Sequence, residues 1–188
     1  MNAYDFDNTI FCGDSTARFY AFELKRHPKI LKKAPSLAGA FFKFYVFKKG
    51  NKTEFKQTMY RFLTCVNDID GEVDAFWEAN FSRIKPFYLK QKLNDDVIIS
   101  ASPEFLLSPA CKKLGLNNLI ASNVDKKSGR YDGINCHGKE KVRRFREKFG
   151  NAVIEEFYSD SYSDTPMAEA AKKAFMVKND EITPWIFK

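Results

Sequence analysis

The apolar positions of the first ninety residues recur at helical spacing, after one short strand at the start of the chain. Residues 1–6 are predicted to form that strand. A helix is predicted from residue 16 to about residue 26, with Asp14 or Ser15 as its N-cap, and His27-Pro28 ends it. Three more apolar segments follow, over residues 37–47, 53–66 and 71–84. None of these segments has a strand pattern, so residues 14–86 are predicted to be an all-helical insert.

Beyond Pro86 the pattern changes to alternating strands and helices. Helices are predicted over residues 85–93, 102–114, 138–149 and 165–174, and strands over residues 96–100, 118–122, 153–159 and 175–177. Ser102 is the expected cap of the second helix, residues 124–135 are an expected hairpin, and residues 180–188 an expected tail. This alternation implies a mostly parallel sheet, and hence an α/β fold class. The predicted organisation is a core of residues 1–13 and 87–188, with a helical domain of residues 14–86 inserted after the first strand.

Composition narrows the class of protein. At 188 residues the chain is long enough for one domain with a good core, or for a domain with a small insert. A hydrophobic fraction of 44% with 19 Phe argues against disorder. The four cysteines have no zinc spacing and no C-x-x-C, so we expect reduced thiols. There is no leader-like N-terminus and no run of 18 apolar residues, so we expect a cytoplasmic protein.

Two carboxylates, Asp5 and Asp7, stand where the first predicted strand ends. Side chains alternate along a strand, so both would point to the same side. Open α/β sheets place their active sites at the carboxyl ends of strands. Paired carboxylates can divide the chemistry, one acting as nucleophile or metal ligand and the other as general acid/base. Taken alone, Asp-x-Asp-x-Thr, which ends at Thr9, is better explained as a polar turn.

Two further polar clusters precede predicted helices. The first, Ser100-Ala101-Ser102, follows a buried strand, and the free N–H groups of the next helix could cradle a phosphate there. Alone, Ser102 is more simply a helix cap. The second cluster contains Lys139 and Lys141 at the start of a basic helix. A lysine there could neutralise a phosphate, or it could belong to a solvated basic face.

A last cluster, residues 159–164, follows the predicted strand 153–159. It contributes two more carboxylates, Asp160 and Asp164. Beside the first pair of aspartates, these would suit a hard divalent cation such as Mg²⁺. The alternative is a polar loop in which Asp164 or Thr165 caps the next helix.

In this order and placement, the four clusters resemble the four motifs of the haloacid dehalogenase (HAD) superfamily of hydrolases, over nearly the whole chain. The helical insert between the first two motifs looks like a C1-type cap, and the ensemble is similar to the phosphoserine-phosphatase-like branch, subfamily IB. The resemblance implies a Rossmann-like core and a phosphomonoester hydrolase that works through an aspartyl-phosphate.

The resemblance also implies roles for the acidic residues. Asp5 is the expected nucleophile, and Asp7 the expected general acid/base. Mg²⁺ is the expected cofactor, bound by Asp5, by the backbone carbonyl of Asp7 and by Asp160, while Asp164 supports the metal shell and the lysine. A carboxylate can approach a phosphate dianion only if cations cancel their repulsion, which agrees with this assignment.

The same resemblance implies a phosphate site. Ser100 and Lys141 are expected to bind the transferring phosphoryl group, with Ala101, Ser102 and Thr9 beside them. Lys141 is preferred to Lys139 because the family's lysine has an apolar residue four positions on, which here is Phe145.

The chain departs from the family pattern in ways that bear on its substrate. Ser159 and Ser163 stand where the fourth motif often has Gly and Asn, and Ser163 can still form hydrogen bonds. Phosphoserine phosphatases grip the amino-acid head group with a Glu and a cap Arg. Here Asp14 occupies the Glu-like place and is a candidate substrate contact, while Arg61 is one position out of register. These departures count against phosphoserine as the substrate.

The insert is strongly basic. Residues 17–62 contain twelve Lys and Arg against two Glu, a net charge of +10, whereas the whole chain carries +7. Aromatic residues are interleaved with these charges. The simplest interpretation is a small helical cap with an aromatic core and a lysine-rich exterior. The alternatives are steering of a polyanionic substrate or contact of residues 37–49 with a membrane surface. We do not expect nucleic acid as a partner.

Three functional hypotheses follow. The leading one is a Mg²⁺-dependent phosphatase acting on a small phosphorylated metabolite. The second is a phosphatase or phosphotransferase that acts on a lipid phosphate or polyanion by means of the basic cap. The third, from a different class, is a catalytically silent protein that binds an anionic partner on the same fold.

Overall fold

A six-stranded sheet organises the computed structural model, which describes residues 1–49, 52–179 and 181–187. The strands are β1 (Ala3–Tyr4), β2 (Val97–Pro103), β3 (Asn118–Ser122), β4 (Ile154–Ser159), β5 (Ala171–Lys178) and β6 (Glu181–Pro184). Their order is β3-β2-β1-β4-β5-β6. The first five are parallel, and β6 is antiparallel to β5. The predicted α/β class is therefore confirmed.

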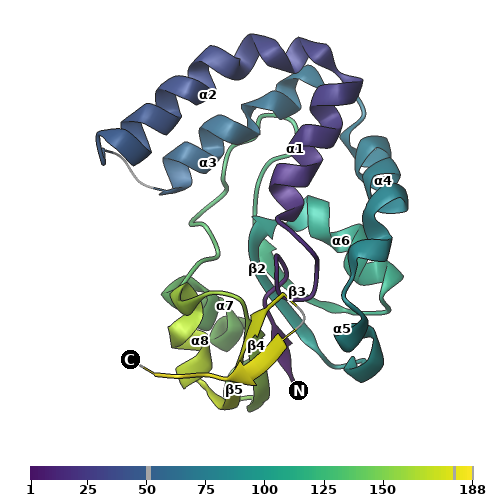
Figure 1. Cartoon of the computed structure of the whole chain (residues 1–188), viewed down its shortest axis with the longest axis vertical. Coiled ribbons are helices and arrows are strands. Elements are labelled where there is room, and N and C mark those ends of the chain that lie inside the picture. Colours follow the sequence, from purple (N-terminus) through teal and green to yellow (C-terminus); the bar gives the residue numbers. More distant parts are fainter. Residues whose placement is uncertain (50–51, 180, 188) are drawn as a thin grey trace.

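Helices cover both faces of the sheet (Figure 1). On one side lie α5 (Pro86–Gln91) and α6 (Glu104–Lys113), and on the other α7 (Lys139–Phe149) and α8 (Thr165–Glu169). The alternation along β2 explains this layering. Ile98 packs in the cluster that contains residues of α5 and α6, whereas Val97 and Ile99 pack with Phe145 of α7.

Every described element between β1 and α5 is helical, as the spacing predicts. These elements are α1 (Ser15–Arg26), η1 (Pro28–Lys33), α2 (Ala34–Phe41), η2 (Phe42–Val46), α3 (Lys52–Tyr60), η3 (Arg61–Cys65), α4 (Ile69–Asn80) and η4 (Phe81–Arg83). Asp14 caps α1 by accepting a hydrogen bond from the Ala17 N–H at 2.8 Å. The division at residues 13/14 and 86/87 into core and cap stays a prediction. One apolar cluster is continuous across it, because Phe19 and Phe76 pack in the same cluster as Tyr4 and Leu106.

The C-terminal part differs from the predicted pattern in two places. The helix predicted to reach residue 174 ends at Glu169, and β5 begins at Ala171 because that segment pairs with β4. The tail predicted from residue 180 contains β6, although residues 180 and 188 lie outside the described part. Trp185, 6% exposed, packs near Phe157 at a ring distance of 6.2 Å and anchors this end on the sheet.

Two local predictions near the sheet have different outcomes. Ser102 does not cap α6, because β2 continues to Pro103 and the helix begins at Glu104 without a side-chain cap. The hairpin predicted over residues 124–135 is present as a chain reversal without named strands: Asp125 N–H donates to the Arg130 carbonyl at 2.8 Å, and Val124 and Tyr131 form an antiparallel bridge.

Candidate active site

The predicted site residues meet at the carboxyl edge of the sheet, where the strand order reverses on either side of β1. Asp5 follows β1, Asp160 follows β4, and Ser100 lies in the middle of β2. This reversal is the crevice in which open α/β sheets bind ligands. Residues that are far apart in the sequence are therefore brought together by topology.

The turn after β1 is shaped by backbone hydrogen bonds. The Phe6 carbonyl accepts the N–H groups of Ile10 and Phe11, at 3.1 and 3.0 Å. Asn8 takes a left-handed conformation with φ 57°, which asparagine tolerates better than most residues. The buried Lys85 donates to the Asn8 carbonyl at 2.7 Å and fixes the turn to the start of α5.

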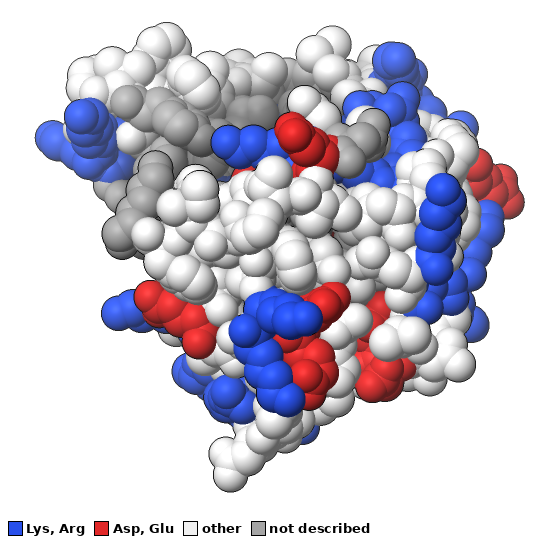
Figure 2. Space-filling view, turned by 60° about the horizontal axis from the view of Figure 1, so that its bottom comes forward, with Lys and Arg blue, Asp and Glu red and all other residues white. Residues whose placement is uncertain are grey.

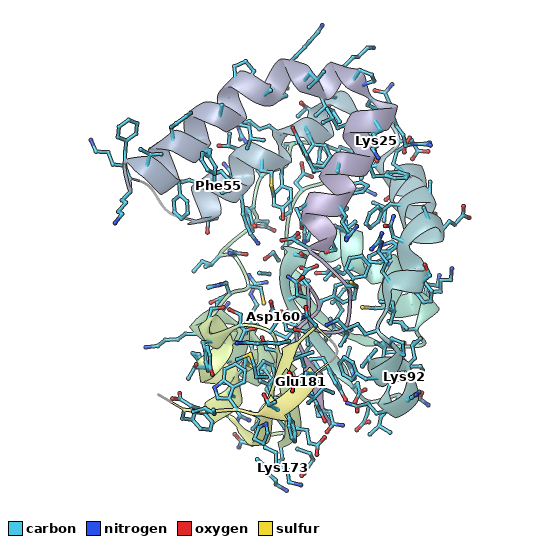
Figure 3. All side chains as sticks on the ribbon, viewed as in Figure 1. Lys25, Phe55, Lys92, Asp160, Lys173 and Glu181 are labelled. Atoms are coloured by element: carbon cyan, nitrogen blue, oxygen red, sulfur yellow. The ribbon has the colours of Figure 1, made fainter. Side chains whose placement is uncertain are left out.

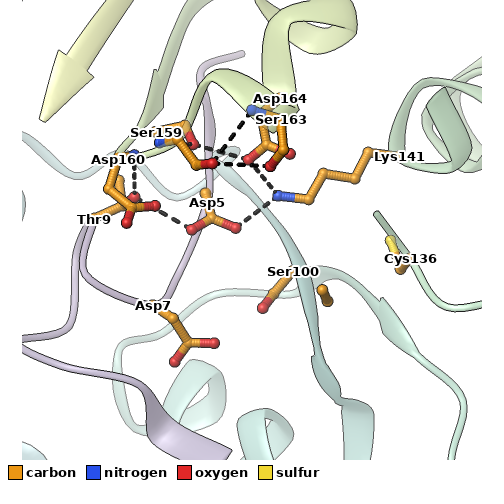
Figure 4. Close-up of polar contacts among 12 residues, drawn as sticks. Asp5, Asp7, Thr9, Ser100, Cys136, Lys141, Ser159, Asp160, Ser163 and Asp164 are labelled. Carbon is orange, nitrogen blue, oxygen red and sulfur yellow. Dashed lines mark hydrogen bonds and ion pairs between the residues drawn. The ribbon is translucent and has the colours of Figure 1, made fainter. Parts of the chain in front are cut away.

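Lys141 bridges two carboxylates at the centre of the site (Figure 4). Its Nζ lies 2.6 Å from Oδ1 of Asp5 and 2.7 Å from Oδ2 of Asp164, and its side chain is almost fully buried. Ser159 Oγ donates to the same Oδ2 of Asp164 at 2.8 Å. Burial acts to lower the pKa of Lys141, but Asp5 and Asp164 outweigh it and raise that pKa, so the ammonium stays charged.

The helix period of α7 places this lysine. Lys141 and Phe145, four residues apart, are the two buried residues of the helix, while Lys139 is exposed. Gly138 precedes the helix with φ 59°, a conformation that glycine adopts without a steric cost. The geometry therefore brings Lys141, and not Lys139, to the aspartates.

Thr9 joins Asp5 to Asp160. Its Oγ1 donates to Oδ2 of Asp5 at 3.2 Å and accepts the backbone N–H of Asp160 at 3.0 Å. Thr9 is fully buried behind these residues and does not line the pocket. Thr9 thus positions two carboxylates. Its side chain is not accessible from the pocket, so it does not reach the place where the phosphate is predicted to bind.

Asp7 is held apart from that cluster, on the side of the pocket next to α1. Its Oδ1 accepts the Ser15 N–H at 2.6 Å, at the start of α1, and its Oδ2 accepts a short hydrogen bond from Ser102 Oγ. Burial, with a smaller contribution from Asp14, raises the pKa of Asp7. A carboxyl group with a raised pKa, held away from the lysine, suits an acid/base role.

A pocket of about 190 Å³ lies between these groups. Its lining contains every predicted site residue except Thr9, namely Asp5, Asp7, Asp14, Ser100, Ala101, Ser102, Lys141, Asp160 and Asp164. Asp14 caps α1 as well as lining the pocket, so one of its oxygens is already engaged. Arg61 lies elsewhere, in a larger cavity with Lys33 and Arg130.

Sequence reasoning missed one basic residue of the pocket. Lys56 reaches the pocket from α3 and donates to the Ala101 carbonyl at 3.2 Å. Its signal in the sequence was only the dense positive charge of residues 17–62, from which no single lysine stands out. His137, two residues before α7, also lines the pocket.

A model of haloacid dehalogenase-like hydrolases matches residues 3–169. The chain belongs to this family. The protein CicA of Caulobacter vibrioides is 32% identical over 93% of the chain and 85% of its own length. A probable phosphatase of Mycobacterium tuberculosis is 33% identical, over 46% of the chain and 32% of its own length.

Solved structures show the same haloacid dehalogenase-like fold. A protein of unknown function from Bordetella pertussis superposes with a TM-score of 0.74, at 17% identity, over 93% of this chain and 87% of its own. A phosphoserine phosphohydrolase-like protein from Francisella tularensis superposes with a TM-score of 0.55, at 16% identity, over 93% of this chain and 86% of its own. Identities this low establish the fold and leave the substrate open.

The charge of this haloacid dehalogenase-like site favours a bound cation. Burial is the largest cause of a raised pKa at Asp5, Asp7 and Asp160, and neighbouring carboxylates add to it at all three. Oδ1 of the buried Asp164 has no hydrogen-bond partner among the described residues. Oxygen donors in a site with excess negative charge fit Mg²⁺.

The predicted metal ligands line one pocket but are not gathered at one point. Among the described residues, the only three acidic, His or Cys side chains whose ligand atoms all lie within 4.8 Å of one another are Glu23, His27 and Glu72. That group lies on α1 and α4 and at the end of α1, outside the catalytic pocket. The expected Mg²⁺ set needs only two carboxylates, because a backbone carbonyl and waters complete its shell.

Proposed function

We propose that the protein is a Mg²⁺-dependent phosphomonoester hydrolase that forms an aspartyl-phosphate on Asp5. Membership of a hydrolase family and the resemblance to a probable phosphatase of Mycobacterium tuberculosis support phosphatase activity. The observation that carries the proposal is the placement of two carboxylates in one pocket with opposite surroundings. Asp5 is hydrogen-bonded to Lys141, and Asp7 is hydrogen-bonded to Ser15 and Ser102.

In the first step, a carboxylate oxygen of Asp5 attacks the phosphorus of the ester and the bond from phosphorus to the leaving oxygen breaks. Protonated Asp7 gives its proton to that oxygen, and the alcohol leaves. In the second step, Asp7 takes a proton from water, which attacks the phosphorus and releases phosphate and free Asp5. The raised pKa of Asp7 favours the protonated form that the first step needs.

The other residues of the site orient the nucleophile and neutralise the charge of the phosphate. Lys141 holds one oxygen of Asp5 and Thr9 the other, so the nucleophile has a fixed orientation. Asp5 and Asp160, with the Asp7 carbonyl, would hold Mg²⁺, which would neutralise the phosphate as it meets the Asp5 carboxylate. Lys56, the basic residue that α3 brings into the pocket, suits a substrate whose leaving group is itself anionic.

A small phosphorylated metabolite fits the limited size of the pocket. A phosphoserine-like substrate is less favoured, because the expected cap arginine is absent from the pocket and Asp14 is partly engaged as a helix cap. We also propose a cytoplasmic location, supported by four free cysteines in the described residues. Among those residues, no helix is long and apolar enough to cross a membrane.

Trapping of the phosphoenzyme tests the proposal. Acid-quenched enzyme with Mg²⁺ and an aryl phosphate is reduced with borohydride, which should convert phosphorylated Asp5 to homoserine, detectable by peptide mass spectrometry. Asp5→Asn should abolish both turnover and trapping, while Asp132→Asn, at an exposed site outside the pocket, should leave both unchanged. Full turnover by Asp5→Asn would refute the nucleophile. Tight anion binding without phosphate release by the natural chain would support the silent anion-binding protein instead.

A further inference from the structure

Helices α2, η2 and α3, within the described residues 34–49 and 52–60, form a structure that we call the cap hairpin. It reaches away from the sheet, with α2 on its outer side (Figure 1). Phe55 of α3, labelled in Figure 3, holds the two arms together, because its ring lies 5.7 Å from that of Phe44 and 6.5 Å from that of Phe41. Lys43 and Glu54 add an ion pair at 3.4 Å. The side chains between the two arms of the hairpin therefore contact one another.

Large apolar side chains are exposed at the end of α2, in η2 and just beyond it. Phe47, Val46 and Phe42 are 66%, 55% and 54% exposed, and Phe41 is nearly half exposed. No residue of α2 is buried. Single exposed apolar residues are ordinary, but several on consecutive turns of one protruding element mark an interaction surface.

Lysines surround these apolar side chains. Lys43 is exposed near the start of η2, and Lys48 and Lys49 are exposed just beyond its end. Neither Lys48 nor Lys49 forms an ion pair with another described residue. Charged side chains are distributed differently on another part of the surface: over the lower half of the face drawn in Figure 2, acidic and basic side chains lie next to one another. The apolar surface therefore coincides with uncompensated positive charge.

We propose that the cap hairpin docks on an anionic lipid bilayer. Phenylalanine side chains beside lysines are the composition of segments that lie in a membrane interface, where the rings enter the headgroup boundary and the lysines contact anionic headgroups. This attachment is peripheral, in agreement with the absence of a spanning helix from the described residues. A second copy of the chain is a poorer occupant, because self-association would bring the same lysines together.

The docked hairpin also adjoins the catalytic pocket. Lys56, one residue after Phe55, leaves α3 in the direction of the pocket and donates to the Ala101 carbonyl. Docking would thus hold the cap side of the pocket close to lipid headgroups. The substrate class that follows is a phosphomonoester whose phosphorylated head group is small enough for the pocket and is carried on a membrane lipid in place of a soluble metabolite. This second step rests on the proposed phosphatase activity.

Vesicle co-sedimentation tests the docking. The full chain should bind vesicles of phosphatidylcholine with phosphatidylglycerol, lose most of that binding at high salt, and bind phosphatidylcholine vesicles weakly. Phe42→Ser/Phe47→Ser and Lys48→Gln/Lys49→Gln should each reduce binding at least about tenfold. The matched controls, Ile134→Ser/Ile186→Ser and Lys172→Gln/Lys173→Gln, change exposed residues of the same kinds outside the hairpin and should bind as the unchanged chain does.

Two activity measurements separate the docking from the phosphatase. Turnover of a soluble aryl phosphate should be unchanged in Phe42→Ser/Phe47→Ser, whereas release of phosphate from phosphatidic acid in the mixed vesicles should fall about as much as binding. No vesicle binding by an enzyme active on the aryl phosphate would overturn the docking alone. Binding without any phosphatase activity would overturn the proposed function alone. A dimer that the phenylalanine variant dissociates, with no vesicle binding, would assign the surface to self-association and overturn the proposal.

Discussion

Removing the charge of Lys141 should damage both the stability and the activity of the enzyme. Lys141→Met keeps the length of the side chain and deletes the ammonium. The lysine is 1% exposed, and its two hydrogen bonds, of 2.6 and 2.7 Å, both go to carboxylates. Deleting one partner of a buried ion pair costs about 3–5 kcal/mol, because a charge is left buried without compensation.

We expect the lower end of that range. Asp5 lines a pocket, so water or a proton can partly compensate for the missing ammonium. A loss of about 3 kcal/mol in the free energy of unfolding would lower the Tm of a chain of this length by about 10 °C. Activity should fall by about a thousandfold, because the orientation of Asp5 and a charge that stabilises the transition state are lost together.

Denaturation in urea with a chelator present gives the stability without a metal contribution. Lys139→Met is the matched control, since Lys139 lies in the same helix, is exposed and makes no contact with the aspartates, so it should behave as the unchanged chain. In Lys141→Met/Asp164→Asn one of the two carboxylates becomes neutral. A double-mutant cycle should therefore give a coupling of about 1.5–3 kcal/mol between the two sites, while activity stays low.

Two results would contradict this reasoning. Lys141→Met with the Tm and kcat of the unchanged chain would show that the lysine neither stabilises nor orients Asp5. Additive effects of the two substitutions would mean that the instability has another origin than unpaired carboxylates, such as poor packing of the methionine.

Three further predictions concern other buried or pocket residues. Ser102→Ala removes a hydrogen bond that stabilises the charged form of Asp7. We expect kcat to fall about tenfold, and the limb of the kcat–pH profile that Asp7 sets to move to higher pH. An unchanged pH profile would refute the contact. Lys56→Gln should raise KM about tenfold for phosphomonoesters with an anionic leaving group and leave KM for a neutral aryl phosphate unchanged, as steady-state kinetics would show. Burial raises the pKa of Glu23 to about 7 in the folded state, whereas the unfolded state loses this proton near the ordinary pKa of 4.5. Between these two pH values the folded state binds more protons than the unfolded state, so the free energy of unfolding decreases as pH rises. Glu23→Gln should abolish about 1–3 kcal/mol of that decrease, measured as urea midpoints at pH 5 and pH 8 (about the two ends of the window), and an equal slope in both proteins would exclude Glu23 as its source.

Local signals were sufficient where a motif lies within one element. Lys141 could be chosen over Lys139 because the family that the chain resembles has an apolar residue four positions after its lysine, here Phe145, and the structure buries both side chains. Strand β3 could be predicted with its observed bounds, since residues 118–122 form a short apolar run. The side of the pocket on which Asp7 lies could not be predicted from the sequence. Ser102 becomes the partner of Asp7 only because β2 continues past the position where the sequence pattern favours a helix cap.

Tertiary pairing decided the remaining elements. The segment that became β5 begins with Ala171 and contains three lysines, and its composition favours a helix, yet it pairs with β4 along most of its length. β6 has only four residues and ends at a proline, so the sequence contains no run of alternating apolar and polar residues that would predict this strand. Lys56 joined the pocket only because α3 brings its side chain to the Ala101 carbonyl of β2, a contact between residues 45 positions apart.

The continuous core limits how this enzyme can admit a substrate. A cap that swings open as one body would have to separate α4 from the sheet domain, where Trp77 Nε1 donates to the Leu106 carbonyl at 2.6 Å and the indole packs near Phe6 and Phe11. Exposing these aromatic side chains would cost several kcal/mol. Helix α2 has no buried residue. The α3 arm, in contrast, is held by Lys56 on the Ala101 carbonyl, by Gln57, which accepts the Tyr131 N–H at 3.3 Å, and by the buried Tyr60. Movement of α2 and η2, with the end of α3 held in place by Tyr60, is therefore the opening that costs least, and the surface that would meet the bilayer is also the part that moves.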